Sequence, residues 1–439
     1  MSILSRREFA RQAATFSLAT GFGGGFAASS KKKKLVTPAV AVPPPPSITG
    51  ADSLKAHAEA VGLRVGCAVV PELLDLDGAI GAGTSDRYSQ AVAAHADIVV
   101  AENAMKWSSL RPSATTYDFS RADKLFTFAG AFGQAVRGHN LCWHEQLPGW
   151  FAGFATKGNA RELLTEHIRV VAGRYAGRVH SWDVVNEAVN LADGRPDGLR
   201  QSPWLELIGP EYLELAFAAA AQADPQAKLT YNDYGIELDT AEQTAKRGQV
   251  LMLLRRLHAR GVAVQAVGIQ SHLQATGPQP GVGLVNFIRE VARMGLDVYV
   301  TEMDVNTHEL DGDAKAQDIA VAEVYRRYLG LVLPEPNVKA VLTWGITDAH
   351  SWLNTIQKPW TMRADGTRQR PLPLDDAYEA TPAFFAMRSA FDGARQQVVP
   401  ADITRPNAVP GPVPGVAAPS GEPFAPFAVP GSPEVPPKP

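Results

Sequence analysis

Short β-rich runs alternate with helical patterns through the middle of the chain, and this alternation constrains the fold more than any other feature. Eight such runs begin at residues 64, 97, 135, 179, 227, 266, 297 and 338. Amphipathic stretches such as 160–177 and 212–223 lie between them. Strands that alternate with helices form parallel sheets joined by crossovers. The eight units predict an α/β fold, a closed (β/α)8 TIM barrel. Because no GxGxxG follows the first run, an open dinucleotide-binding sheet is disfavoured.

The start of the chain differs from this middle. Residues 1–47 begin with Arg6-Arg7, continue through a weakly apolar stretch and end in a Pro-rich linker. This order resembles a twin-arginine export signal, although Ala10 stands where such signals usually have Leu. We therefore expect export to the periplasm or the medium. A disordered basic N-terminus on a cytosolic protein is the alternative.

The end of the chain is also distinct. Residues 396–439 contain thirteen prolines interspersed with Gly, Ala and Val. Such a segment cannot bury enough surface to offset its ordering entropy, so we expect a disordered tail or spacer. One large domain is then expected over 48–395.

The composition excludes several classes of protein. The formal charge of −3 and the 45% hydrophobic content argue against nucleic-acid binding, and no apolar run is long enough to span a membrane. The two cysteines, Cys67 and Cys142, form no CxxC or Cys/His cluster, so no zinc site is expected. Both thiols are predicted to be free and buried, on the first and third strands. A monomer is expected.

Most of the β-rich runs end in polar or aromatic side chains. In chain order these are Glu102, Asn103, His139, Asn140, Asn186, Glu187, Asn232, Asp233, Gln270, His272, Glu302, Asp304 and Trp344. The carboxyl ends of the strands of a barrel meet at one mouth, where barrel active sites are built. The sequence therefore predicts a polar site at that mouth.

Two glutamates suggest the chemistry of this site. Glu187 and Glu302 are expected to end the fourth and seventh strands. A pair of opposed carboxylates, one protonated and one ionised, is what cleavage of a glycosidic bond requires. His272 could hold Glu302 ionised, and Asn186 could bind a sugar hydroxyl. A single glutamate at a strand end is more often a salt-bridged rim residue, but the pair with its amide and imidazole neighbours favours catalysis.

For the aromatic and histidine residues, a role in the site has to be compared with ordinary packing in the core. Trp143, Trp344 and Trp352 offer flat apolar faces for sugar rings, whereas Trp182 is expected to be core. The histidines of the third run are compatible with ordinary barrel packing. WHEQL is a weak metal motif because no second His follows at i+4.

An ordered set of motifs resembles the endo-β-1,4-xylanases of glycoside hydrolase family 10. The motifs are AENAMKW, RGHNLCWHEQLPGW, WDVVNEA, YNDYG, GIQSHL, VTEMDV, TWGITDAHSWL and RPLPLD, and they extend over about 60–392. The resemblance implies a retaining, double-displacement endo-1,4-β-xylanase that needs no cofactor and acts on xylan and xylo-oligosaccharides.

The resemblance also implies roles for individual residues. Glu187 matches the acid/base of the family and Glu302 its nucleophile, while Asn186 matches the residue that holds the sugar 2-hydroxyl. Gln270 matches the partner of the acid/base, and His272 with Asp304 matches the pair that orients the nucleophile. The remaining matches bind sugar rings: Glu102, Asn103, Lys106, His139 and Trp143 on the non-reducing side, and Trp344 and Trp352 over the cleavage point.

The sequence departs from the family pattern at four positions. Ser108 and Arg111 replace acidic residues after Lys106-Trp107, and we expect this change to affect local packing behind the site. Cys142 and Glu145 stand where Val and Ser are more common. A β-glucanase or cellobiosidase on the same barrel is the enzymatic alternative, and a non-catalytic carbohydrate-binding barrel is the other.

Overall fold

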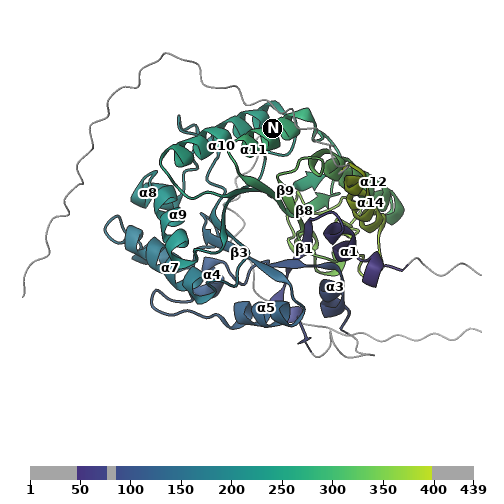
Figure 1. The fold of residues 1–439 in the computed structure, drawn as a ribbon, viewed down its shortest axis with the longest axis horizontal. Coiled ribbons are helices and arrows are strands. Elements are labelled where there is room, and N and C mark those ends of the chain that lie inside the picture. The colour runs from purple at the N-terminus through teal and green to yellow at the C-terminus, as the bar shows by residue number, and fades with distance from the viewer. Residues whose placement is uncertain (1–46, 77–85, 398–439) are drawn as a thin grey trace, which may run out of the picture. The chain divides into compact units, whose positions relative to one another are not determined.

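A ring of parallel strands forms the centre of the molecule (Figure 1). The computed structural model describes residues 47–76 and 86–397. Within them, neighbouring strands pair in the order β6-β5-β4-β3-β2-β1-β9-β8, and a β6–β8 pairing closes the ring. The short strand β7 pairs only with β8, outside the ring. The strands are β1 Arg64–Val69, β2 Ile98–Ala101, β3 Ala135–Cys142, β4 Ser181–Asn186, β5 Lys228–Asp233, β6 Ala266–Ile269, β7 His272–Gln274, β8 Asp297–Asn306 and β9 Val338–Thr343.

Helices surround this ring, as a (β/α)8 barrel requires (Figure 1). The helices of the described residues are α1 Leu54–Glu59, α3 Arg87–His95, α4 Trp107–Leu110, α5 Ser120–Ala131, α6 Phe151–Phe154, α7 Ala160–Arg174, α8 Pro203–Ile208, α9 Tyr212–Ala223, α10 Ala241–Ala259, α11 Val282–Arg293, α12 Ala314–Val332, α13 Trp352–Thr355 and α14 Pro382–Gln397. The predicted barrel is confirmed, and the amphipathic stretches at 160 and 212 form α7 and α9.

Packing between the strands and the surrounding helices depends on close contact between neighbouring strands. Trp182 on β4 is fully buried, as predicted, and its indole N–H donates to Oδ2 of Asp224 at 3.0 Å. The ring lies against Gly138 of β3, where an added Cβ would be 2.0 Å from Cε3 of Trp182. The glycine is therefore required for this contact.

Two details of the strands differ from the sequence prediction. The run at 266 was expected to be one strand, but it breaks at Ser271, whose φ is +64°, and gives β6 and β7. The Ser271 N–H donates to the buried carboxylate of Glu237 at 3.0 Å, which holds the break. Glu302 does not end its strand, because β8 continues to Asn306 by pairing with β7.

Both cysteines are free and buried, as predicted. Cys67 lies on β1 and Cys142 ends β3, with β2 between these strands. Burial raises the pKa of Cys67 to about 12 and also raises that of Cys142.

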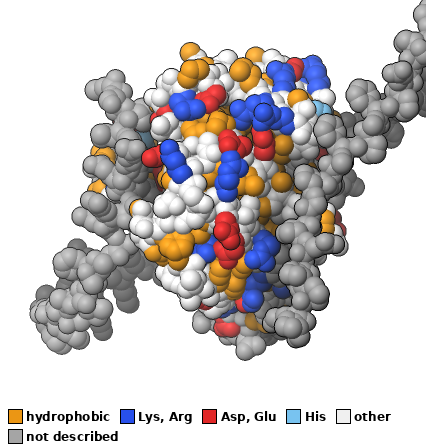
Figure 2. Space-filling model, turned by 90° about the vertical axis from the view of Figure 1, so that its left-hand side faces the viewer, with side chains coloured by type: hydrophobic (Ala, Val, Ile, Leu, Met, Phe, Trp, Pro, Cys, Tyr) orange, Lys and Arg blue, Asp and Glu red, His pale blue; other side chains and the backbone are white. Residues whose placement is uncertain are grey.

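On the side of the barrel that carries α7, α8 and α9, acidic and basic side chains are interspersed (Figure 2). Ion pairs link neighbouring helices there, such as Arg161 with Glu211 and Arg260 with Glu214. None of the helices in the described ranges is long and apolar enough to cross a membrane. The expected export signal and Pro-rich tail stay predictions. Except for Ser47 and residues 396–397, both segments lie outside the described residues.

Candidate active site

One cavity at the carboxyl ends of the strands brings the candidate residues together. It is lined by Glu102, Asn103, Lys106, His139, Trp143, Asn186, Glu187, Gln270, His272, Glu302, Trp344 and Trp352. These are all of the residues to which the family resemblance gives a role, except Asp304. Asp304 lies behind His272 and is hydrogen-bonded to it. The mouth of the barrel is thus the site, as the strand ends indicated.

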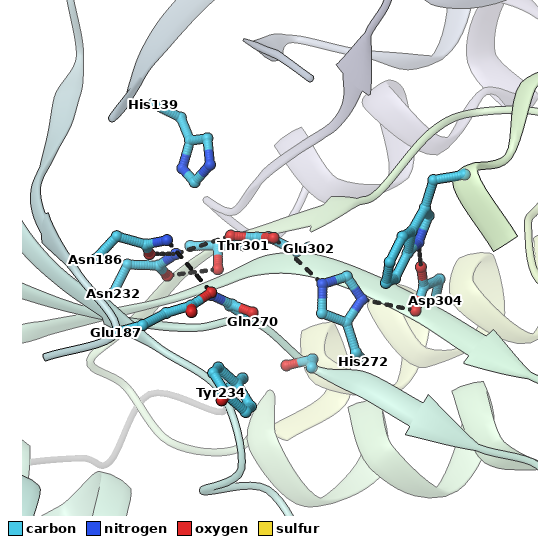
Figure 3. Close-up of polar contacts among 12 residues, drawn as sticks. His139, Asn186, Glu187, Asn232, Tyr234, Gln270, His272, Thr301, Glu302 and Asp304 are labelled. Carbon is cyan, nitrogen blue, oxygen red and sulfur yellow. Dashed lines mark hydrogen bonds and ion pairs between the residues drawn. The ribbon is translucent and has the colours of Figure 1, made fainter. Parts of the chain in front are cut away.

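Glu302 projects from β8 into a set of fixed hydrogen-bond donors (Figure 3). Its Oε1 accepts from Nδ2 of Asn232 at 2.8 Å, and its Oε2 lies 3.3 Å from Nε2 of His272. Asn232 is itself held, because its Oδ1 accepts from the hydroxyl of Thr301 at 2.8 Å. The carboxylate is therefore held on both oxygens, by Asn232 and His272.

Glu187 follows β4 directly and has a strained backbone. Its φ is +59°, in the left-handed region that residues other than glycine rarely adopt. Two contacts hold this conformation: the Glu187 N–H donates to the carbonyl of Asn232 at 2.8 Å, and Nε of Arg200 donates to the Glu187 carbonyl at 2.7 Å. The side chain is then presented to Gln270, whose Nε2 donates to Oε1 of Glu187 at 2.9 Å (Figure 3).

Asn186 and Asn232 link the two glutamates. Nδ2 of Asn232 lies 2.9 Å from Oδ1 of Asn186 as well as contacting Glu302, and Nδ2 of Asn186 lies 3.4 Å from Oε1 of Glu187. The amide of Asn186 therefore lies beside Glu187 and is connected to Glu302 through Asn232.

His272 lies between two carboxylates. Its Nδ1 is 2.8 Å from Oδ1 of Asp304, whose other oxygen accepts from the indole N–H of Trp352 at 2.5 Å. Burial alone lowers the pKa of His272, but Asp304 and Glu302 outweigh it and raise the pKa to about 10. His272 is therefore a cation beside Glu302 at neutral pH.

The wall next to β2 carries a buried cation. Nζ of Lys106 donates to Oδ1 of Asn103 at 3.0 Å and lies over the rings of Trp143 and Trp344, 5.2 and 5.7 Å from their centroids. Burial lowers the pKa of Lys106, an effect that Glu102 opposes most strongly. Burial likewise raises the pKa of Glu102, which Lys106 opposes. This wall offers donors, an acceptor and aromatic faces to the cavity.

His139 is oriented from below the cavity. Its Nδ1 lies 2.9 Å from Oδ2 of Asp183, which also forms a buried ion pair with Arg137. The imidazole ring contacts Trp344 edge-on, with centroids 5.4 Å apart. His139 thus has a partner in Asp183, while its Nε2 lies 3.4 Å from Nδ2 of Asn140.

Arg111, one of the departures from the family pattern, forms an ion pair. Nη1 of Arg111 lies 2.6 Å from Oε2 of Glu166 on α7, and the guanidinium packs over the rings of Tyr117 and Trp150. Neither Arg111 nor Ser108 lines the cavity. Both positions therefore lie outside the lining of the cavity, and the expected effect on local packing stays a prediction.

Five further residues line the cavity and were not selected from the sequence. They are Glu145, Gln146, Thr355, Ile356 and Trp360. Glu145 and Gln146 belong to the WHEQL motif next to Trp143, so the sequence could have predicted that they line the cavity. The other three lie on α13 and the segment after it, whose path is set by contacts with distant residues.

A (β/α)8 barrel with two buried glutamates, a histidine–aspartate pair and several tryptophans at its mouth defines a glycoside hydrolase. No group of three or more His, Cys, Asp or Glu side chains that could hold a metal occurs in the part of the chain that the structure describes. The sequence profile of Glycosyl hydrolase family 10 matches residues 53–390. The chain belongs to this family.

Relatives and solved structures agree. Endo-1,4-beta-xylanase B of Thermotoga neapolitana is 34% identical over 343 residues, which is 77% of this chain and 91% of that protein. Beta-1,4-xylanase of Dictyoglomus thermophilum is 36% identical over 326 residues, or 70% of this chain and 86% of that protein. Xylanase 10B from Thermotoga petrophila RKU-1, solved in complex with xylobiose, superposes with a TM-score of 0.68 at 33% identity, covering 78% of this chain and 98% of that one.

Proposed function

We propose that the protein is a retaining endo-1,4-β-xylanase that cleaves internal β-1,4-xylosidic bonds. The observation that carries this proposal is the contrast between the surroundings of the two glutamates. Glu302 has an amide donor, Asn232, on one oxygen and His272 beside the other, which orients its carboxylate as a nucleophile. Glu187 faces the neutral amide of Gln270, which suits a group that exchanges a proton during the reaction.

The reaction takes two steps. An oxygen of Glu302 attacks the anomeric carbon while protonated Glu187 donates its proton to the leaving glycosidic oxygen, so that the C–O bond breaks and a glycosyl-enzyme ester forms. Glu187, now ionised, removes a proton from water, and that water attacks the same carbon and releases Glu302. Two inversions retain the β configuration, which requires the carboxyl groups to be about 5–5.5 Å apart.

Substitution of each glutamate tests these roles. Glu302→Ala is expected to lower kcat by at least about 10⁴-fold on every substrate, since nothing else can form the covalent intermediate. Glu187→Ala should lose xylan hydrolysis but still form the intermediate from aryl xylobiosides with good leaving groups, and azide should then give a β-glycosyl azide. Glu323→Ala, an exposed change on α12, is the matched control. A Glu302→Ala variant that azide rescues as a β-glycosyl azide, together with an inactive Glu187→Ala, would reverse the assignment. An α-configured first product by NMR would exclude retention.

The enzymatic alternative is tested with the same reagents. If the natural substrate is xylan, kcat/KM for an aryl xylobioside should exceed that for the matching aryl cellobioside, because Lys106, Trp344 and Trp352 crowd the space around the sugar. Higher activity on the cellobioside would favour the β-glucanase, and no activity on either would favour a binding barrel.

We also propose that the protein is exported through a twin-arginine signal. Arg6-Arg7 and the weakly apolar stretch that follows support this proposal. Replacing both arginines with lysine should retain the enzyme inside a bacterial host. Unchanged activity in the periplasm or medium would contradict it.

A further inference from the structure

Trp360 extends the aromatic surface of the cavity. It lines the same cavity as the two glutamates, and 38% of the residue remains exposed. Its ring centroid lies 5.6 Å from that of Trp352, with the two planes inclined by 58°. The exposed indole therefore continues the sugar-facing surface of Trp352 towards solvent.

The backbone that carries this indole is held in place by side chains. Nδ2 of Asn306, the last residue of β8, donates to the carbonyl of Trp360 at 2.9 Å. The next carbonyl, that of Thr361, accepts from Nε2 of Gln369 at 2.6 Å. The Thr361 N–H donates to the carbonyl of Lys358 at 2.9 Å, which closes a turn around Trp360.

A buried arginine anchors the same segment to the chain after β8. Arg363 is only 6% exposed. Its guanidinium donates to the carbonyls of Thr307 at 2.7 Å, Leu310 at 2.8 Å and Gly312 at 2.9 Å. These bonds fix the position of the segment relative to Glu302, because Thr307 follows β8 directly.

We infer that Trp360 binds an additional sugar ring of the bound polysaccharide, outside the ring held by Trp344 and Trp352. Single exposed apolar residues are common on protein surfaces and need no explanation. Trp360 differs because its large flat face opens onto the cavity and its backbone is already ordered, so that stacking on the apolar face of a sugar costs little further entropy. The inference rests on the proposed function, since the ligand is taken to be a xylan chain.

Substrates of different length distinguish the binding of an additional sugar ring from an effect of Trp360 on the catalytic site. An aryl xylobioside fills two sugar sites, whereas xylohexaose reaches further along the cavity. Trp360→Ala is expected to lower kcat/KM for xylohexaose roughly tenfold, equivalent to about 1.4 kcal/mol, and to leave the aryl xylobioside unchanged. Trp360→Phe should recover part of the loss. Met362→Ala is the control, because Met362 lies on the same segment, is 57% exposed and does not line the cavity.

Each outcome is decisive. Wild-type rates for Trp360→Ala on xylohexaose would overturn the inference. An equal loss on the aryl xylobioside would also overturn it, since Trp360 would then act on the catalytic site itself. A wild-type enzyme that hydrolyses neither substrate would instead overturn the proposed function. A shift in the xylohexaose cleavage pattern would show on which side of the cleaved bond Trp360 acts.

Discussion

At the scale of single residues, the charge of His272 depends on Asp304. We predict that Asp304→Asn lowers the pKa of His272, because the Asp304 carboxylate is the strongest of the effects that raise it. The alkaline limb of the kcat/KM profile should move to lower pH, and kcat at pH 7 should fall about 10- to 100-fold, the range for losing a hydrogen bond to a charged group. Trp352→Phe keeps the carboxylate and should leave the alkaline limb in place. An unchanged profile in Asp304→Asn would contradict the prediction.

The same residue makes stability depend on pH. The folded-state pKa of about 10 lies above the ordinary value of 6.5, so protonated His272 stabilises the fold fully below pH 6.5 and loses this effect as pH rises through 10. We therefore expect the difference in unfolding free energy between wild type and His272→Gln to shrink from pH 6 to pH 10. Urea unfolding at both values measures it. A difference that stays constant would show that His272 is neutral in the fold.

At the scale of elements, the contact between β3 and β4 permits a direct test of packing. Gly138→Ala would place a methyl group inside the ring of Trp182, and we expect a loss of at least about 2 kcal/mol of unfolding free energy, as for other overpacked cores. Gly130→Ala in α5 is the control. No heavy atom lies within 4 Å of that Cβ position, so about 0.5–1 kcal/mol of stabilisation is expected in chemical denaturation. Equal stability of the two variants would show that Trp182 can move.

The strands could be predicted from the sequence because their signal is local. Apolar β-rich runs separated by amphipathic stretches were enough to locate each barrel strand and, through the ends of those strands, the cavity. The break at Ser271 was not predictable in this way, because its positive φ is held by Glu237, a residue 34 positions earlier in the chain. Trp360 was missed for the same reason, since Asn306 and Arg363 fix its position through contacts with other loops.

At the scale of the whole molecule, the barrel needs no covalent cross-link. Cys67 and Cys142 lie on strands separated by β2, and both are buried. A thiol reagent should therefore react slowly with the native protein and should find two thiols per chain after denaturation without reductant. Zero thiols in the denatured, unreduced protein would reveal a disulfide and contradict the structure.

The backbone conformation that presents the Glu187 side chain for catalysis is strained, so catalysis and the stability of the fold are opposed at this position. Glu187→Gly and Glu187→Ala both remove the carboxylate, but only glycine adopts a φ of +59° without strain, so the glycine variant should be more stable by about 1 kcal/mol. Thermal unfolding of the two variants measures this difference, and equal melting temperatures would show that the strain is negligible. A library of this enzyme screened only for heat resistance would then enrich glycine at 187 and lose turnover. Directed evolution towards a more heat-resistant variant must therefore select for activity in every round.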